Sequence, residues 1–257
     1  MRQQFLTLGL IATAVTCLTF TTQAQQIQVT VENLQPADGF FFTPVWVGFH
    51  DGSFDLFDAG STASAGLELI AEEGDFSVLS NEFAGSGTDG AVFGPGGFGG
   101  APVIDPGEVT SALFDIGADD RYFSFASMVI PSNDAFFGNG DPLAHQLFDG
   151  NGIFNGPLTI DIIGGDIYDS GTEVNDGQGA AFSATGGTST EEGGVVALHP
   201  GLENFLNTQT AAGTTIGSIP GTNTPFARIT ITQVVPEPTT AGLLAGLAGC
   251  VLVRRRR

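Results

Sequence analysis

The stretch MVIPSNDAFFG at residues 128–138 decides the fold, because an apolar strand there stops at a proline and turns over an Asn-Asp pair. A second stretch, YDSGTE at residues 168–173, repeats the arrangement, with β-type sequence running into a turn rich in Gly, Ser and carboxylates. Loops at one end of a β-sandwich assemble oxygen-lined cation sites in this way. We therefore expect the two turns to meet around a calcium ion.

Periodicity predicts short strands and little helix over most of the chain. Ile27, Val29 and Val31 alternate with polar residues, the pattern of a strand with one buried face. Further strands are expected at residues 43–50, 108–114, 122–130, 158–163 and 226–235, and helices at 61–73 and 75–83, with Gly74 ending the first and Asp75 capping the second. Residues 85–100 are interpreted as a mobile glycine-rich loop, and no elements are assigned at 176–223. This pattern indicates a β-sandwich or barrel.

The N-terminal segment, residues 1–24, has the layout of a secretory signal peptide. A charged start at Arg2, a short apolar centre and small residues before a cut after Ala24 all fit that interpretation. The remaining chain up to residue 235 is long enough for one sizeable all-β domain, residues 25–235.

The C-terminal segment, residues 236–257, reads Pro-Glu-Pro, an apolar run at 241–253 and four arginines. The run is shorter than the roughly 20 residues that span a bilayer comfortably, but the arginines would hold its end on the cytoplasmic side. This order resembles the bacterial PEP-CTERM sorting signal. The resemblance implies transient inner-membrane anchoring through 241–253, cleavage by an exosortase-type processing enzyme, and release to the outer envelope or extracellular matrix. A plain tail anchor that is never cut is the alternative.

The domain between these ends is strongly acidic. The whole sequence has a formal net charge of −21, yet residues 25–235 hold all the acidic residues except Glu237, with Arg121 and Arg228 as their only Lys or Arg. Such a body repels nucleic acid and anionic lipid and attracts divalent cations, so no nucleic-acid partner is expected. Both cysteines, Cys17 and Cys250, lie in the end segments, so we expect no disulfide in the domain.

The two acidic turns supply the candidate metal ligands. Calcium takes about six to eight oxygen ligands, and Asp134, Asp169 and Glu173 offer three carboxylates, with Asn133 as a neutral oxygen donor. Magnesium prefers a tighter octahedron, and zinc prefers His or Cys, which these turns lack. Spacing alone leaves open whether the turns are neighbours. A further acidic segment at 51–58 lacks EF-hand spacing and is interpreted as a solvated turn.

From about residue 27 to residue 235 the chain resembles the spondin domain found in F-spondin and in many bacterial secreted proteins. The segments that carry the likeness, in the family's order, are Thr43-Pro44, Gly60–Glu68 with Ala71–Gly74, Met128–Phe136 and Tyr168–Asn175. The resemblance implies an antiparallel β-sandwich with one or two short helices and long Gly-rich loops. It also implies calcium bound by Asp134, Asp169 and Glu173. Animal versions carry Asp where this chain has Glu173, and cysteines that are absent here.

These observations predict an exported, non-enzymatic, calcium-binding domain with an adhesive or structural role at the cell envelope or in an extracellular polysaccharide matrix. His50, His145 and His199 are isolated from any nucleophile elbow or metal-ligand spacing, so no catalytic residue is assigned. Trp46 is interpreted as a core residue rather than a sugar-stacking platform. The alternatives are a polysaccharide-active enzyme of the matrix and a ligand-free structural envelope protein.

Overall fold

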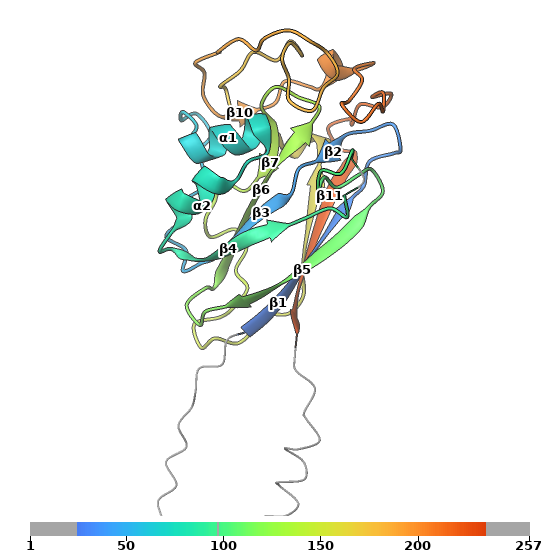
Figure 1. Cartoon of the computed structure of the whole chain (residues 1–257). Coiled ribbons are helices and arrows are strands. Elements are labelled where there is room, and N and C mark those ends of the chain that lie inside the picture. Colours follow the sequence, from blue (N-terminus) through green and yellow to red (C-terminus); the bar gives the residue numbers. More distant parts are fainter. Residues whose placement is uncertain (1–24, 97, 235–257) are drawn as a thin grey trace, which may run out of the picture.

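The protein folds as a sandwich of two antiparallel β-sheets, which confirms the predicted fold class (Figure 1). The computed structural model describes residues 25–96 and 98–234; the expected signal peptide and sorting segment lie outside them. The strands are β1 (Gln25–Asn33), β2 (Phe41–Phe42), β3 (Val45–His50), β4 (Gly87–Val92), β5 (Val109–Ile116), β6 (Tyr122–Ile130), β7 (Ala135–Gly138), β8 (Leu158–Ile163), β9 (Ile167–Asp169), β10 (Ala197–Leu198) and β11 (Pro225–Val234), and the helices are α1 (Ala65–Glu73) and α2 (Ser77–Phe83), with 3-10 turns at Gly164–Asp166 and Glu203–Phe205.

The smaller sheet has the strand order β5-β1-β11-β8, and the larger has the order β10-β9-β7-β6-β3-β4, with β2 paired to β6. In the smaller sheet Val29 of β1 lies opposite Ile231 of β11, and both side chains are fully buried. The adjacent pair, Thr30 and Thr230, lies on the other face and is partly exposed. The predicted alternation of β1 and β11 is therefore confirmed, with one face in the core.

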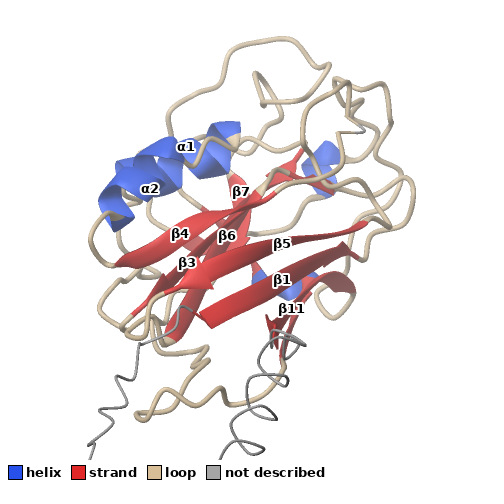
Figure 2. Ribbon diagram, turned by 60° about the horizontal axis from the view of Figure 1, so that its bottom comes forward, coloured by secondary structure: helices blue, strands red, loops and turns tan. Residues whose placement is uncertain are grey.

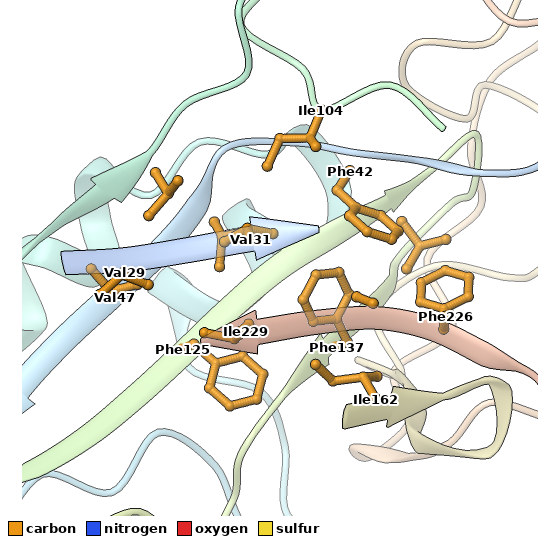
Figure 3. Close-up of a cluster of buried hydrophobic side chains, with 14 of the residues drawn as sticks. Val29, Val31, Phe42, Val47, Ile104, Phe125, Phe137, Ile162, Phe226 and Ile229 are labelled. Carbon is orange, nitrogen blue, oxygen red and sulfur yellow. The ribbon is translucent and has the colours of Figure 1, made fainter. Parts of the chain in front are cut away.

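Aliphatic and aromatic side chains together fill the space between the sheets (Figure 3). The ring of Phe137 in β7 lies 4.9 Å from that of Phe42 and 6.1 Å from that of Phe226 in β11, both edge-to-face. All three rings are fully buried. Because their contacts join β7 to β11, this core holds the two sheets together.

Helices α1 and α2 cover the outer face of the larger sheet (Figure 2). Leu67 and Ile70 of α1 and Phe83 of α2 pack in one cluster with Trp46 of β3. The Trp46 ring is completely buried and lies 5.4 Å from that of Phe83, and its indole N–H donates to Asp89. Trp46 is thus a core residue, as predicted. Strand β6 is apolar on both faces because one face meets the sandwich core, while on the other Ala126 packs with the helices and Met128 and Ile130 pack with Phe41, Phe98 and Val103.

Both helices begin later than the sequence predicted. The Ser64 side chain accepts the Leu67 N–H at 3.2 Å, which makes Ser64 the N-cap of α1. Gly74, with φ of 68°, ends the helix as expected. The N-cap of α2 is Phe76 rather than Asp75. Asp75 lies one residue earlier, and its carboxylate accepts the Ser77 N–H.

The prediction of a loop at residues 85–100 was wrong for β4, which pairs along the whole of β3. Gly90 explains this, since a Cβ there would lie 2.8 Å from the ring of Phe114. Glycine allows the aromatic ring to approach the strand, so the glycine content does not mark a loop here.

The two ends of the described chain lie at one pole of the sandwich. Gln26 of β1 pairs with Val234 of β11, while α1 and the irregular loops between residues 170 and 215 gather at the opposite pole (Figure 1). Within the described ranges, no helix is both long and apolar enough to cross a membrane. The apolar run at 241–253 lies outside those ranges.

Candidate metal centre

The first acidic turn joins β6 to β7 and is closed by a serine. Ser132 accepts the Ala135 N–H at 3.1 Å and donates to the carbonyl of Val129, so its hydroxyl bridges the two strand ends. Proline at 131 stops β6 because it offers no N–H to the sheet. The turn therefore presents Asp134 from a fixed backbone at the pole that carries the loops, where its side chain is fully buried.

The second turn follows β9 and lies directly against the first. One carboxylate oxygen of Asp134, Oδ2, accepts the Ser170 hydroxyl at 2.9 Å, the Thr172 N–H at 2.9 Å and the Glu173 N–H at 3.2 Å. The pairing of β7 with β9, which sets Ala135 opposite Asp169, fixes this register. The structure thus brings together the two turns that the sequence left unconnected.

The other oxygen of Asp134, Oδ1, is buried and has no hydrogen-bond partner. A buried carboxylate oxygen without a partner carries a large desolvation cost. Among residues 25–96 and 98–234, no cationic side chain forms an ion pair with Asp134; the ion pair found there joins Arg228 to Asp161, whose side chains lie on the exposed face of the smaller sheet. Such an orphaned oxygen fits a hard cation.

Asp169 lies at the start of the second turn and is 8% exposed. Its Oδ1 accepts the Gly171 N–H at 2.7 Å, and its Oδ2 accepts the side-chain amide of Asn175 at 2.6 Å. Burial raises the pKa of Asp169 to about 6, and the nearby charge of Asp134 adds to the shift. The neighbouring acids therefore repel one another in the absence of a cation.

The side chains of Glu173 and Asn133 are joined only by a long hydrogen bond. The Asn133 amide donates to the Glu173 carboxylate at 3.4 Å and to the Gln178 carbonyl at 3.0 Å, while its Oδ1 accepts the Gly177 N–H at 2.9 Å. Asn133 was expected to offer its side-chain oxygen to the metal. That oxygen instead accepts a backbone N–H, and the side chain ties the two turns together. Glu173 is partly exposed, which leaves its carboxylate free to reorient.

Helix α1 adds an acidic residue, Glu72, that was not among the candidate metal ligands expected from the sequence. Burial raises the pKa of Glu72 to about 7; an interaction with the Thr172 side chain opposes this shift, and the charges of Glu173, Glu68 and Asp134 increase it. The i, i+4 spacing of Glu68 and Glu72 was the available signal, since it puts both on one side of the helix. Only the tertiary packing of α1 against the turn reveals which carboxylates they face.

In the part of the chain that the structure describes, no three His, Cys, Asp or Glu side chains already form a group that could hold a metal ion. Asp134, Asp169 and Glu173 are neighbours, but Oδ2 of Asp134 and both oxygens of Asp169 accept hydrogen bonds from residues of the second turn and the segment after it. In the acidic segment at 51–58 the three aspartates are exposed and Asp51 accepts the Ser53 N–H, while Leu56 and Phe57 are buried. His50 is fully buried against the Ser124 hydroxyl at 3.0 Å.

A comparison with known families matches residues 32–191, more than half of the chain, to the family model described as Spondin_N. The matched range runs from β1 to the loop after the second acidic turn and so includes both turns. A search of curated proteins found no match. The chain belongs to the spondin N-terminal domain family.

Proposed function

We propose that this protein is an exported calcium-binding spondin domain with an adhesive or structural role at the cell envelope or in an extracellular polysaccharide matrix. The observation that carries the calcium proposal is the orphaned Oδ1 of Asp134, buried beside two further carboxylates. Calcium accepts carboxylate, carbonyl and water oxygens in flexible loops, and its large shell tolerates the irregular donor set of these turns.

Calcium binding requires Glu173 to turn its carboxylate toward Asp134 and Asp169. Glu173 is partly exposed and its contact with Asn133 is long, so its movement breaks only a weak hydrogen bond. The ion would neutralise the repulsion from Asp134, which adds to the effect of burial on the pKa of Asp169. It would also join the turn after β6 to the turn after β9. Its effect is to stiffen the loop-bearing pole of the sandwich.

The proposed export and membrane attachment are inferred from the two end segments of the sequence. Residues 1–24 would direct secretion, and residues 236–257 would anchor the chain transiently in the inner membrane until an exosortase-type enzyme cleaves them. An extracellular polysaccharide is the proposed partner. Calcium ions bound to the acidic domain can also coordinate the oxygens of anionic or hydroxyl-rich polysaccharide chains and so bridge the two. The spondin family is not a known enzyme family, which favours this binding role over polysaccharide cleavage.

Thermal unfolding of the purified protein tests calcium binding. The midpoint is expected to rise by several degrees in millimolar calcium relative to chelator, and to rise less in magnesium, because a ligand that binds only the folded state stabilises it. Asp134→Ala should abolish the response, whereas Asp51→Ala in the distant exposed turn should leave it intact. Equal midpoints for the wild type in calcium and in chelator would refute the proposal.

A further inference from the structure

A chain of hydrogen bonds runs from Asp169 into a distant part of the sequence. Asn175 donates its side-chain amide to Oδ2 of Asp169 at 2.6 Å, and its side-chain oxygen lies 2.9 Å from Nε2 of His199. Nδ1 of His199 in turn accepts the Gly201 N–H at 3.1 Å. The loop after β10 therefore reaches the second acidic turn through two side chains.

The direction of every bond in this chain is determined. Because Nδ1 of His199 accepts a backbone N–H, it carries a lone pair, and the proton of the neutral imidazole must sit on Nε2. Nε2 then donates to the oxygen of Asn175, which leaves the Asn175 amide group to donate to Asp169. A reversed Asn175 amide would place its NH₂ group against the Nε2–H of His199.

The surroundings keep His199 in this neutral form. Burial lowers its pKa, although the charges of Asp134 and Glu203 act in the opposite direction. An imidazolium would also set an Nδ1–H against the Gly201 N–H. The ring itself is held in place by its backbone, since the His199 N–H donates to the carbonyl of Ile167 at 2.9 Å.

We propose that His199, acting through Asn175, is a positioning residue for the calcium site: it fixes the donor that orients the Asp169 carboxylate. This inference rests on the proposed calcium binding. Asp169 carries one hydrogen bond on each oxygen, from Gly171 and from Asn175. Its rotamer is thus set from both sides, and each oxygen keeps a lone pair for the metal. Partners that orient a metal-binding carboxylate typically contribute a factor of about 10–100 to metal affinity.

Calorimetric titration of calcium into the full-length protein tests the proposal. His199→Phe keeps the ring volume without the donor and should weaken calcium binding by about 10–100-fold. His199→Gln can present an amide N–H at the position of Nε2 and should restore most of the affinity. Asn175→Ala breaks the chain at its other link and should match His199→Phe. Asn204→Ala is the control, because Asn204 donates to the backbone carbonyl of Asn175 rather than to the chain that reaches Asp169.

Urea unfolding in chelator separates positioning from plain stability. A positioning role predicts that His199→Gln and His199→Phe differ in calcium affinity much more than in calcium-free stability. The proposal is overturned if both substitutions weaken calcium binding equally, or if His199→Phe and Asn175→Ala bind calcium as tightly as the wild type. Should the wild type itself bind no calcium, the proposed function fails and this inference fails with it.

Discussion

Replacing Glu72 by Gln is expected to stabilise the calcium-free protein at neutral pH. The pKa of this carboxyl rises from its ordinary 4.5 to about 7 in the folded state. The folded protein therefore holds the proton more tightly than the unfolded chain. The stabilisation linked to this group is complete below pH 4.5 and is lost as the pH rises towards 7. At pH 7.5 the wild type buries a charge that glutamine does not have.

The size of the effect follows from the shift. A shift of this size corresponds to about 3 kcal/mol at roughly 1.4 kcal/mol per pKa unit, and the hydration that Glu72 keeps reduces this to about 1–2 kcal/mol. Urea unfolding in chelator should show Glu72→Gln more stable than the wild type by that amount at pH 7.5, with most of the difference gone at pH 4.5. Glu73→Gln, on the exposed side of the same helix, is the matched control and should change little.

Calcium should reduce this difference in stability. The ion compensates the negative charges around Glu72, so the wild type gains more stability from calcium than the glutamine variant does. If Glu72→Gln is no more stable than the wild type in chelator at pH 7.5, or if Glu73→Gln gives the same gain, Glu72 does not face the acids of the two turns.

Three further substitutions test the fold. Phe137→Ala should destabilise the protein by about 3–5 kcal/mol in chemical denaturation, because it opens a cavity between the sheets. Phe93→Ala, at a half-exposed ring, should cost far less stability, and equal costs for the two variants would contradict the described core. Ser64→Ala should cost about 0.5–2 kcal/mol through loss of the α1 cap and should lower far-UV helix signal on warming, whereas Ser64→Asp should retain most of the stability. Gly90→Leu should cost at least about 1–3 kcal/mol from its clash with Phe114, and an unchanged midpoint would show that β4 does not lie against β5.

Local sequence patterns predicted the strands well where one physical cause dominates. The run at 122–130 is apolar because both faces of β6 are covered, and the structure places β6 over the same residues. Strand β8 at 158–163 also matches its prediction. The strand at 87–92 was missed because glycine there serves the approach of the Phe114 ring, a contact that residues distant in sequence create.

The candidate site was predictable only in part. The acidic turns were visible because carboxylates cluster with Gly and Ser after apolar strands. Glu72 was not, since an acidic residue on a helix reads as a solvated one until the packing of α1 is known. His199 lies in a stretch without periodic pattern, and its bond with Asn175 joins residues that are 24 positions apart. Contacts of that kind leave no spacing rule in a sequence.

The position of the chain ends has a mechanical consequence for an adhesive domain. Strand β11 runs from the pole of the acidic turns to the pole of the two ends, with β1 on one side and β8 on the other. A pull between a ligand at the turns and an anchor at the C-terminal end would load β11 along its length, so the hydrogen bonds on both of its sides would resist together in shear. A pull between the two ends would instead separate β1 from β11 one hydrogen bond at a time, beginning at Gln26 and Val234. The sandwich is therefore expected to be stronger along its long axis than across its termini.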